Sequence, residues 1–301
     1  PYFLLMLSVL IPTYNYDITP LVHEIHQQAL SCNMVFEILV YDDGSKSPLN
    51  KNNQSINELE YCKFKELEHN IGRSAIRNLL GTDAKYEFLL FLDADVLPIS
   101  SDFLLSYKKM LNLNTQIIYG GICYQKEVPA PKEKLRWIYG KKREALTVEE
   151  RSKSPYLSFL TLNFIVRKGL FSHLKFNEDI PNLRNEDLIF AIDARAKQVT
   201  IKHINNPVLH LGIESSQKYL KKTIDTLHSF NIIISKGFLN PNDASLTRIA
   251  FKMESLKLGF VFRFIHRLFN TYFEKNLLSN KPSLFIFDVY RLCYFLHLKK
   301  N

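Results

Sequence analysis

Acidic pairs stand at three points of the sequence where an apolar run ends or a helix is expected to begin: Asp42-Asp43, Asp93-Ala94-Asp95 and Glu186-Asp187. Carboxylates at positions i and i+2, as in Asp93 and Asp95, can both reach a hard divalent cation that bridges phosphate oxygens. A carboxylate near other anions has a raised proton affinity, which suits Asp187 to general-base work. Each pair alone also fits a plain structural explanation, because acids are common at strand ends and in first helical turns.

The elements expected around these acids alternate between apolar strands and helices. Strands are predicted over 4–12, 36–41, 63–68, 87–92, 116–124 and 158–167, and helices over 19–30, 73–81, 103–113 and 184–197. Ser101 and Asp102 are expected to cap the helix 103–113. Continuous apolar strands separated by helices predict an α/β fold with a mostly parallel sheet that is flanked by helices. The polar strand ends should meet at one rim, where such sheets bind ligands.

The remaining segments suggest how the chain is organised. We expect a helix around 135–146, extended segments at 199–202 and 207–211, a long helix at 215–234 and a turn-rich linker at 237–243. The predicted division is a catalytic domain over 1–236, with a nucleotide-sugar half at 1–124 and an acceptor half at 125–236. Residues 237–301 are expected to form a basic, amphipathic helical extension.

Composition narrows the class of protein. The chain has 301 residues, 46% of them hydrophobic, which suits a globular protein with a sizeable core and not a disordered chain. Its four cysteines form no C-x-x-C pair, so zinc sites and disulfide frameworks are not expected, and reduced thiols fit a cytoplasmic setting. The apolar start is too short to cross a bilayer and lacks the features of a signal peptide, and no other segment predicts a membrane span.

The positive charge is concentrated near the C-terminus. The formal net charge is +9, and residues 246–301 contain ten Lys or Arg against three acids. Phe, Leu and Tyr are interleaved with these cations, which favours an anionic membrane surface as the partner over nucleic acid. The alternatives are helices that pack on the catalytic domain, or a contact between two copies of the chain.

The order of the motifs is more specific than any single one. The segments L-S-V-L-I-P-T-Y-N, V-Y-D-D-G-S, N-I-G-R-S-A-I-R-N, F-L-D-A-D and N-E-D follow one another between residue 7 and about residue 212. This series resembles the family 2 glycosyltransferases. The resemblance implies a GT-A (Rossmann-like) fold, a nucleotide-sugar donor with UDP favoured, Mn²⁺ or Mg²⁺ as cofactor, and inversion at the anomeric carbon.

The resemblance also implies roles for individual residues. Asp187 matches the catalytic base. The nucleotide-binding set is Pro12, Tyr14, Asp42, Asp43, Arg77, Asp93 and Ala94. The metal ligands are Asp95, Asp93 and His210. Val96 stands where relatives often have a further acid, so fewer carboxylates are left for the metal.

Three residues are expected on the acceptor side: Trp137, Arg136 and Glu186. Trp137 can stack on a sugar face, and Arg136 can meet an anion; the alternative for Trp137 is a core position on an amphipathic helix. The acceptor implied is a glycan or lipid-linked glycan, as in bacterial surface-polysaccharide assembly, and the transferred group a hexose or N-acetylhexosamine. That acceptor fits a protein held peripherally on the inner face of the plasma membrane.

Two other functions compete with sugar transfer. A nucleotidyltransferase would normally have a Gly-rich, basic loop after the first strand, and here that loop is Pro12-Thr13-Tyr14-Asn15. A non-catalytic, membrane-associated protein that binds nucleotide sugars would be expected to lack Asp95 or Asp187, and both are present.

Overall fold

The computed structural model describes residues 6–180 and 184–299. Contacts divide the chain into two compact units, each assembled from separate stretches of sequence. The first unit comprises residues 1–123, 145–178 and 186–212, and the second comprises 124–144, 179–185 and 213–301. The extension predicted at 237–301 therefore groups with the preceding long helix. The predicted boundary between residues 236 and 237 stays a prediction.

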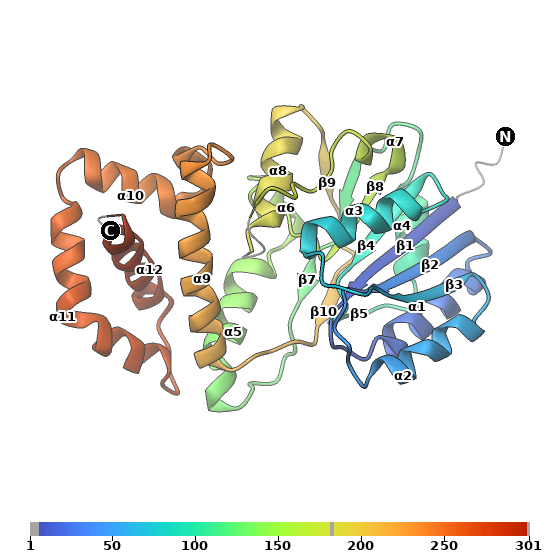
Figure 1. Cartoon of the computed structure of the whole chain (residues 1–301), viewed down its shortest axis with the longest axis horizontal. Helices are drawn as coiled ribbons and strands as arrows, with labels where there is room; N and C mark the ends of the chain where they lie inside the picture. The colour runs from blue at the N-terminus through green and yellow to red at the C-terminus, as the bar shows by residue number, and fades with distance from the viewer. Residues whose placement is uncertain (1–5, 181–183, 300–301) are drawn as a thin grey trace. The chain divides into compact units, whose positions relative to one another are not determined.

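A seven-stranded sheet forms the centre of the first unit (Figure 1). Its order is β3 (Cys62–Glu66), β2 (Val35–Asp42), β1 (Met6–Thr13), β4 (Phe88–Leu92), β8 (Asn163–Arg167), β6 (Ile117–Tyr119) and β9 (Ile201–His203). All neighbouring strands are parallel except at β8, which runs antiparallel to β4 and β6. The prediction of a mostly parallel α/β sheet is confirmed.

A second, three-stranded sheet lies in the same unit, with the order β5 (Val96–Pro98), β10 (Val208–His210) and β7 (Ile122–Cys123). The sequence predicted one strand over 116–124, but the chain changes sheets between β6 and β7. Gly121 makes the change with φ 103°, and a side chain at Gly120 would collide with Asn163, Tyr107 and a backbone oxygen. Two glycines therefore break a segment whose apolar residues alone predict a continuous strand.

Helices flank the sheet of the first unit. They are α1 (Thr19–Ser31), α2 (Asn50–Asn53), α3 (Arg73–Asp83), α4 (Phe103–Met110), α6 (Val148–Ser152), α7 (Lys168–Phe171) and α8 (Glu186–Ala196), with a 3₁₀ turn at Gln54–Glu58. The capping prediction for α4 was wrong. Asp102 is its N-cap residue, but the Asp102 side chain makes no capping hydrogen bond, and the Asp102 N–H donates to Ser100 Oγ.

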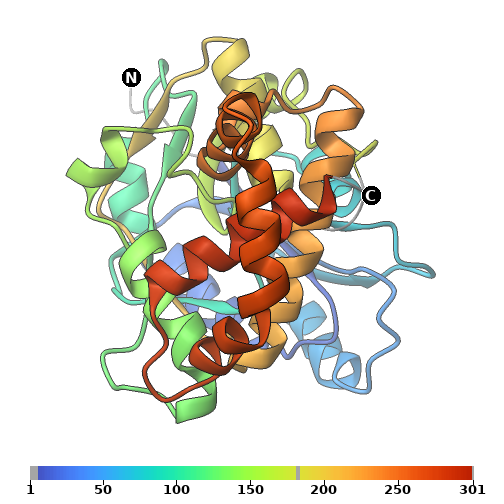
Figure 2. The ribbon, with the colours of Figure 1, turned by 90° about the vertical axis from the view of Figure 1, so that its left-hand side faces the viewer.

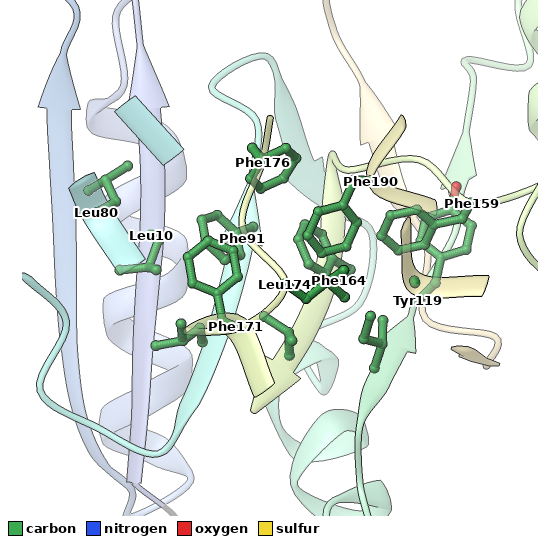
Figure 3. Close-up of a cluster of buried hydrophobic side chains, with 14 of the residues drawn as sticks. Leu10, Leu80, Phe91, Tyr119, Phe159, Phe164, Phe171, Leu174, Phe176 and Phe190 are labelled. Atoms are coloured by element: carbon green, nitrogen blue, oxygen red, sulfur yellow. The ribbon is translucent and has the colours of Figure 1, made fainter. Parts of the chain in front are cut away.

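Aromatic side chains form a large core under α3, α7 and α8 (Figure 3). Phe164 of β8 lies at its centre, stacked on Phe91 at 5.0 Å between ring centroids and 5.7 Å from Phe190. Phe176 stacks on Phe190 at 4.6 Å. This packing ties β4, β8 and α8 together, and these are the elements that carry two of the acidic pairs.

The second unit is helical (Figure 2). It contains α5 (Lys134–Tyr139), α9 (Ser216–Ser235), α10 (Ser245–Ser255), α11 (Gly259–Leu277) and α12 (Leu284–Leu298), with 3₁₀ turns at Pro131–Glu133 and Pro241–Asp243. The helix predicted over 135–146 ends at Tyr139, and a π-helical turn, Gly140–Glu144, continues it. Leu135, Leu220, Phe273 and Phe287 share one core, so α5, α9, α11 and α12 form a single body. No helix in the described parts of the chain has the length and apolarity needed to cross a membrane.

Replacing Phe164 with Ala is expected to lower the free energy of unfolding by about 3–5 kcal/mol, because the aromatic core cannot close over the cavity. Denaturant unfolding followed by circular dichroism measures this change. Phe285→Ala is the matched control: its side chain is 77% exposed, so the loss should stay within about 0.5 kcal/mol. Equal losses in both variants would contradict this description of the core.

Candidate active site

The carboxyl ends of three neighbouring strands form one rim of the first unit. β2, β1 and β4 are adjacent and parallel, so Asp43, Tyr14 and Asp93 follow strands that end at the same edge. The Asp43 N–H donates to the Thr13 carbonyl at 2.9 Å, which joins two of these ends directly. The predicted convergence of the polar strand ends is confirmed.

The two acids at the end of β2, Asp42 and Asp43, have different hydrogen-bond partners. Asp42 is fully buried and accepts hydrogen bonds from the N–H and hydroxyl of Ser45, so it closes the turn. Asp43 is also buried, and its two carboxylate oxygens accept the N–H groups of Ile71 and Gly72 at 2.7 and 3.0 Å. Asp43 thereby fixes the loop that leads into α3.

Glycine is required beside Asp43. Gly44 has φ 66°, and an added Cβ would lie 2.5 Å from the His69 carbonyl carbon. A side chain would be strained by that φ and would push the 69–72 loop away from the strand end.

The turn after β1 presents Tyr14 to solvent, with 59% of its surface exposed. Pro12 lies within β1, opposite Tyr41 of β2, so it contributes to the strand that carries the turn. Asn15 has φ 51°, and its side-chain oxygen accepts a hydrogen bond from Ser47. The left-handed Asn15 and its bond hold the turn while the Tyr14 ring stays accessible at the rim.

A buried guanidinium connects the acids of β4 and α8. Arg77 of α3 donates to Asp93 at 2.7 Å and lies 3.8 Å from a carboxylate oxygen of Glu186. Arg73, one turn earlier, reaches the same Glu186 oxygen at 3.2 Å. Burial lowers the pKa of Arg77, but Asp93, Glu186 and Asp187 outweigh burial and raise it, so the guanidinium stays charged.

Asp187 has a raised pKa, and its role as the base stays a prediction. Burial, followed by the charge of Glu186, raises the pKa of Asp187 to about 6. The Arg77 charge and a 2.7 Å hydrogen bond from the Thr161 hydroxyl oppose this rise. Asp187 is therefore ionised at neutral pH and still basic enough to accept a proton.

Asp95 and His210 meet across the small sheet. Val96 of β5 pairs with His210 of β10, and His210 Nε2 lies 3.6 Å from Asp95 Oδ2. A Cβ at Gly212 would lie 2.4 Å from the same Asp95 oxygen, so only glycine leaves that oxygen its place. Val96 is a buried residue of β5. Its burial explains an apolar side chain at the position where relatives were expected to have a further acid.

The predicted metal set is brought together only in part. Asp95 and His210 are neighbours, whereas Asp93 bonds to Arg77, and Ala94 lies between the two acids. Within residues 6–180 and 184–299, no group of three or more His, Cys, Asp or Glu side chains is arranged to hold an ion. A site of one carboxylate and one imidazole would leave most coordination positions to phosphate oxygens and water.

The three residues expected on the acceptor side have other partners. Glu186 is buried against Arg73 and Arg77. Trp137 and Arg136 belong to the second unit, where the indole N–H of Trp137 donates to the Gln125 carbonyl and Lys141 lies over its ring. Contact of these residues with an acceptor stays a prediction.

Sequence reasoning missed three residues of this site. Arg73 stands inside the N-I-G-R segment, so its charge beside Arg77 was a usable signal. Thr161 lay inside a segment predicted as strand, yet β8 begins only at Asn163 and Thr161 turns to Asp187. Tyr16 follows the exposed turn; burial and then the charge of Asp95 raise the pKa of its phenol, which places it near that acid.

The fold and the rim define a protein of the GT-A class, as predicted. The model of glycosyl transferase family 2 matches residues 8–172, more than half of the chain. The chain belongs to glycosyl transferase family 2.

The chain is also similar to individual proteins. The chain is 37% identical over 100 residues to chondroitin synthase of Pasteurella multocida (strain Pm70). The match covers 31% of this chain and 10% of that protein. The mannosyltransferase PcManGT from Pyrobaculum calidifontis, solved with GDP-Man and Mn²⁺, has a TM-score of 0.61 at 14% identity, over 98% of this chain and 86% of that one. TarS 1-349 of S. aureus has a TM-score of 0.50 at 16% identity, over 98% and 91%.

Replacing Thr161 with Val is expected to raise the pKa of Asp187 further, because the hydroxyl that stabilises the ionised carboxylate is removed. ¹³C-carboxyl NMR titration measures the midpoint, with Asp187→Asn used to assign the signal. Thr161→Ser keeps the donor and should titrate like the parent protein. Identical midpoints in the Val and Ser variants would contradict the role given to this hydrogen bond.

Proposed function

We propose that this protein transfers a sugar from a nucleotide-sugar donor to a hydroxyl group of a glycan or lipid-linked glycan, with inversion at the anomeric carbon. The observation that supports this most directly is Asp187, a carboxylate with a raised pKa. Its charge acts on Arg77, which forms an ion pair with Asp93 at the rim where the strands end. Family membership supports the class of reaction.

The donor would bind at the rim of the first unit. Exposed Tyr14 can pack on a nucleobase, and Asp43, whose N–H donates to the Thr13 carbonyl, holds the loop that enters α3. A UDP-sugar is the favoured donor by resemblance to the family, and GDP-Man in the related mannosyltransferase supports GDP as the alternative. Transfer of a hexose or an N-acetylhexosamine is equally compatible with these contacts.

A divalent cation fits the residues present. Asp95 and His210 offer one hard oxygen and one imidazole nitrogen, and Mg²⁺ or Mn²⁺ commonly takes its other ligands from substrate phosphates. The related mannosyltransferase was solved with Mn²⁺. When bound, the cation would neutralise charge on the departing diphosphate. Gly212, which has no side chain, leaves room for the Asp95 oxygen.

Asp187 would accept the proton of the acceptor hydroxyl. The acceptor oxygen attacks the anomeric carbon as the bond from that carbon to the diphosphate breaks, and the proton passes to an Asp187 oxygen. One displacement inverts the configuration and requires no nucleophile from the protein. Thr161 holds one Asp187 oxygen, and the Arg77 charge keeps the carboxylate ionised before the proton arrives.

A panel of UDP-, GDP- and dTDP-sugars, assayed for release of the nucleoside diphosphate with Mn²⁺ or EDTA, tests the proposed function. We expect metal-dependent release from one donor class, with activity that falls below about pH 6 as Asp187 becomes protonated. Asp187→Asn should retain donor binding while kcat drops by about 10²–10⁴-fold. Normal turnover in that variant would refute the base assignment.

If no donor of the panel is hydrolysed, UDP is titrated in the presence of Mn²⁺ into the parent protein and into Asp95→Asn. Binding that depends on Asp95 would show that an acceptor is needed for turnover. No binding of UDP to the parent protein would contradict UDP as the donor nucleotide, and no binding of GDP or dTDP either would contradict the proposed donor site.

We also propose that the second unit attaches the protein to an anionic membrane surface. Phe260, Phe264, Leu268 and Tyr272 recur every fourth residue along α11 and are each 57–65% exposed. This spacing places them along one stripe of the helix. The exposed cations Lys252, Lys257, Arg267 and Lys275 come from α10, α11 and the turn between them. An apolar stripe beside cations is typical of helices that lie in the headgroup region.

The triple substitution Phe260→Ser, Phe264→Ser and Leu268→Ser should lower partitioning into phosphatidylglycerol vesicles at least about tenfold. Vesicle co-sedimentation measures it, with phosphatidylcholine vesicles as the uncharged reference. Deleting residues 246–301 would not be a clean test, because α11 and α12 share a core with Leu135 and Leu220. Leu30→Ser and Leu113→Ser, at exposed positions of the first unit, are the controls. A change in oligomeric mass without a change in vesicle binding would favour a contact between copies.

A further inference from the structure

The second unit contains a cavity of its own. Its volume is about 220 Å³, and every residue that lines it belongs to that unit. It lies among α5, α9, α12 and the segments around Arg184 and Glu214. Pockets for drug-sized ligands span about 300–1,000 Å³, so this cavity suits a smaller group such as one sugar residue.

The lining of the cavity has an excess of positive charge. Arg136, Arg184, Lys222 and Arg291 face two carboxylates, Glu144 and Glu214. Just outside the lining, Asp288 is shared by Arg143 at 2.8 Å and Arg291 at 3.8 Å, so these neighbours leave the excess of cations unchanged. The cavity therefore favours an anion.

The four cations do not contribute equally. Arg136 is largely neutralised, because it bonds to Glu144 at 2.9 Å and lies between the rings of Tyr124 and Tyr219. Lys222 contacts Glu214, yet burial and then the charges of Arg184 and Lys218 lower its pKa. An ammonium group that neighbouring cations destabilise gains from an arriving anion. Lys222 is thus better placed than Arg136 to bind one, and so is Arg291, whose contact with Asp288 is long, at 3.8 Å.

One wall of the cavity is aromatic. The rings of Tyr139, Tyr219 and Phe287 contact one another, with centroids 5.6–5.8 Å apart. An aromatic wall beside a few charged groups is the usual composition of a site for a small organic ligand. It adds a surface on which the apolar face of a sugar ring can pack.

We propose that this cavity binds one saccharide residue that bears a carboxylate or a phosphate. Lys222 and Arg291 would bind the anionic group, and the partly buried rings of Tyr139 and Tyr219, backed by the buried Phe287, would contact the sugar. If the proposed function holds, this residue belongs to the acceptor, and that part of the inference rests on the proposed function. Binding itself is independent of it.

Isothermal titration calorimetry with glucuronate, glucose 6-phosphate, glucose and inorganic phosphate tests the site. We expect at least one of the two anionic sugars to bind at least about tenfold more tightly than both glucose and phosphate. A preference between glucuronate and glucose 6-phosphate would identify the anionic group. Lys222→Met and Arg291→Met should each weaken that binding at least about tenfold. Thermal unfolding checks that both variants remain folded.

Lys221→Met is the matched control, because Lys221 is exposed on the same helix and does not line the cavity. If glucose binds as tightly as the anionic sugars, the proposed preference for an anion is wrong. If free phosphate binds as tightly as they do, the proposed contact with the sugar ring is wrong. If Lys222→Met and Arg291→Met both bind as the parent protein does, the anionic sugar does not bind in this cavity. Donor hydrolysis and donor-nucleotide binding, measured on the same variants, separate the two proposals: saccharide binding by a parent protein that neither hydrolyses a donor nor binds its nucleotide would refute the proposed function alone.

Discussion

The buried charge of Arg77 is the constraint on which the rim depends. A guanidinium removed from water must be surrounded by anions, and here Asp93 and Glu186 come from elements far apart in the sequence. Removing one partner of such a buried pair typically costs about 3–5 kcal/mol, so α3, the end of β4 and the start of α8 hold one another in place. The same charge limits how far the pKa of Asp187 rises. A single cation thus sets both the geometry of the rim and the protonation of its most basic acid.

The sheet could be predicted from sequence because its strands are continuous apolar runs that end in polar clusters. β1, β2 and β4 satisfy that pattern, and their order in a parallel sheet brings their ends together. The segment 116–124 and the region before β8 could not be assigned in the same way. There the apolar pattern continues, while the backbone is decided by close approach at Gly120 and by the side-chain bonds of Asn163 to Gly121 and Asn206. The Gly120-Gly121 pair is a local signal of the break, but the contacts that require these glycines are tertiary and cannot be read from the segment itself.

The candidate site, too, could be predicted from the sequence only in part. The acids were recognisable from their type and spacing, but the partner of each was not. Asp42 and Asp43 are adjacent, yet one closes a turn and the other fixes a loop 28 residues away. Thr161 holds Asp187 only because β8 starts later than its sequence suggests. Likewise, the positive cavity of the second unit combines α5, α9 and α12, which no sequence window spans.

The antiparallel strand β8 has a consequence for the order of folding during synthesis. It lies between β4 and β6, so the edge of β4 has no partner until residues 163–167 have left the ribosome. More than 70 residues must therefore be synthesised after β4 before β8 is complete, and they include residues 124–144 of the other unit. At about 5–20 residues per second this leaves an apolar strand edge exposed for several seconds. Until β8 pairs with it, that edge is the part of the nascent sheet that is open to pairing with another chain.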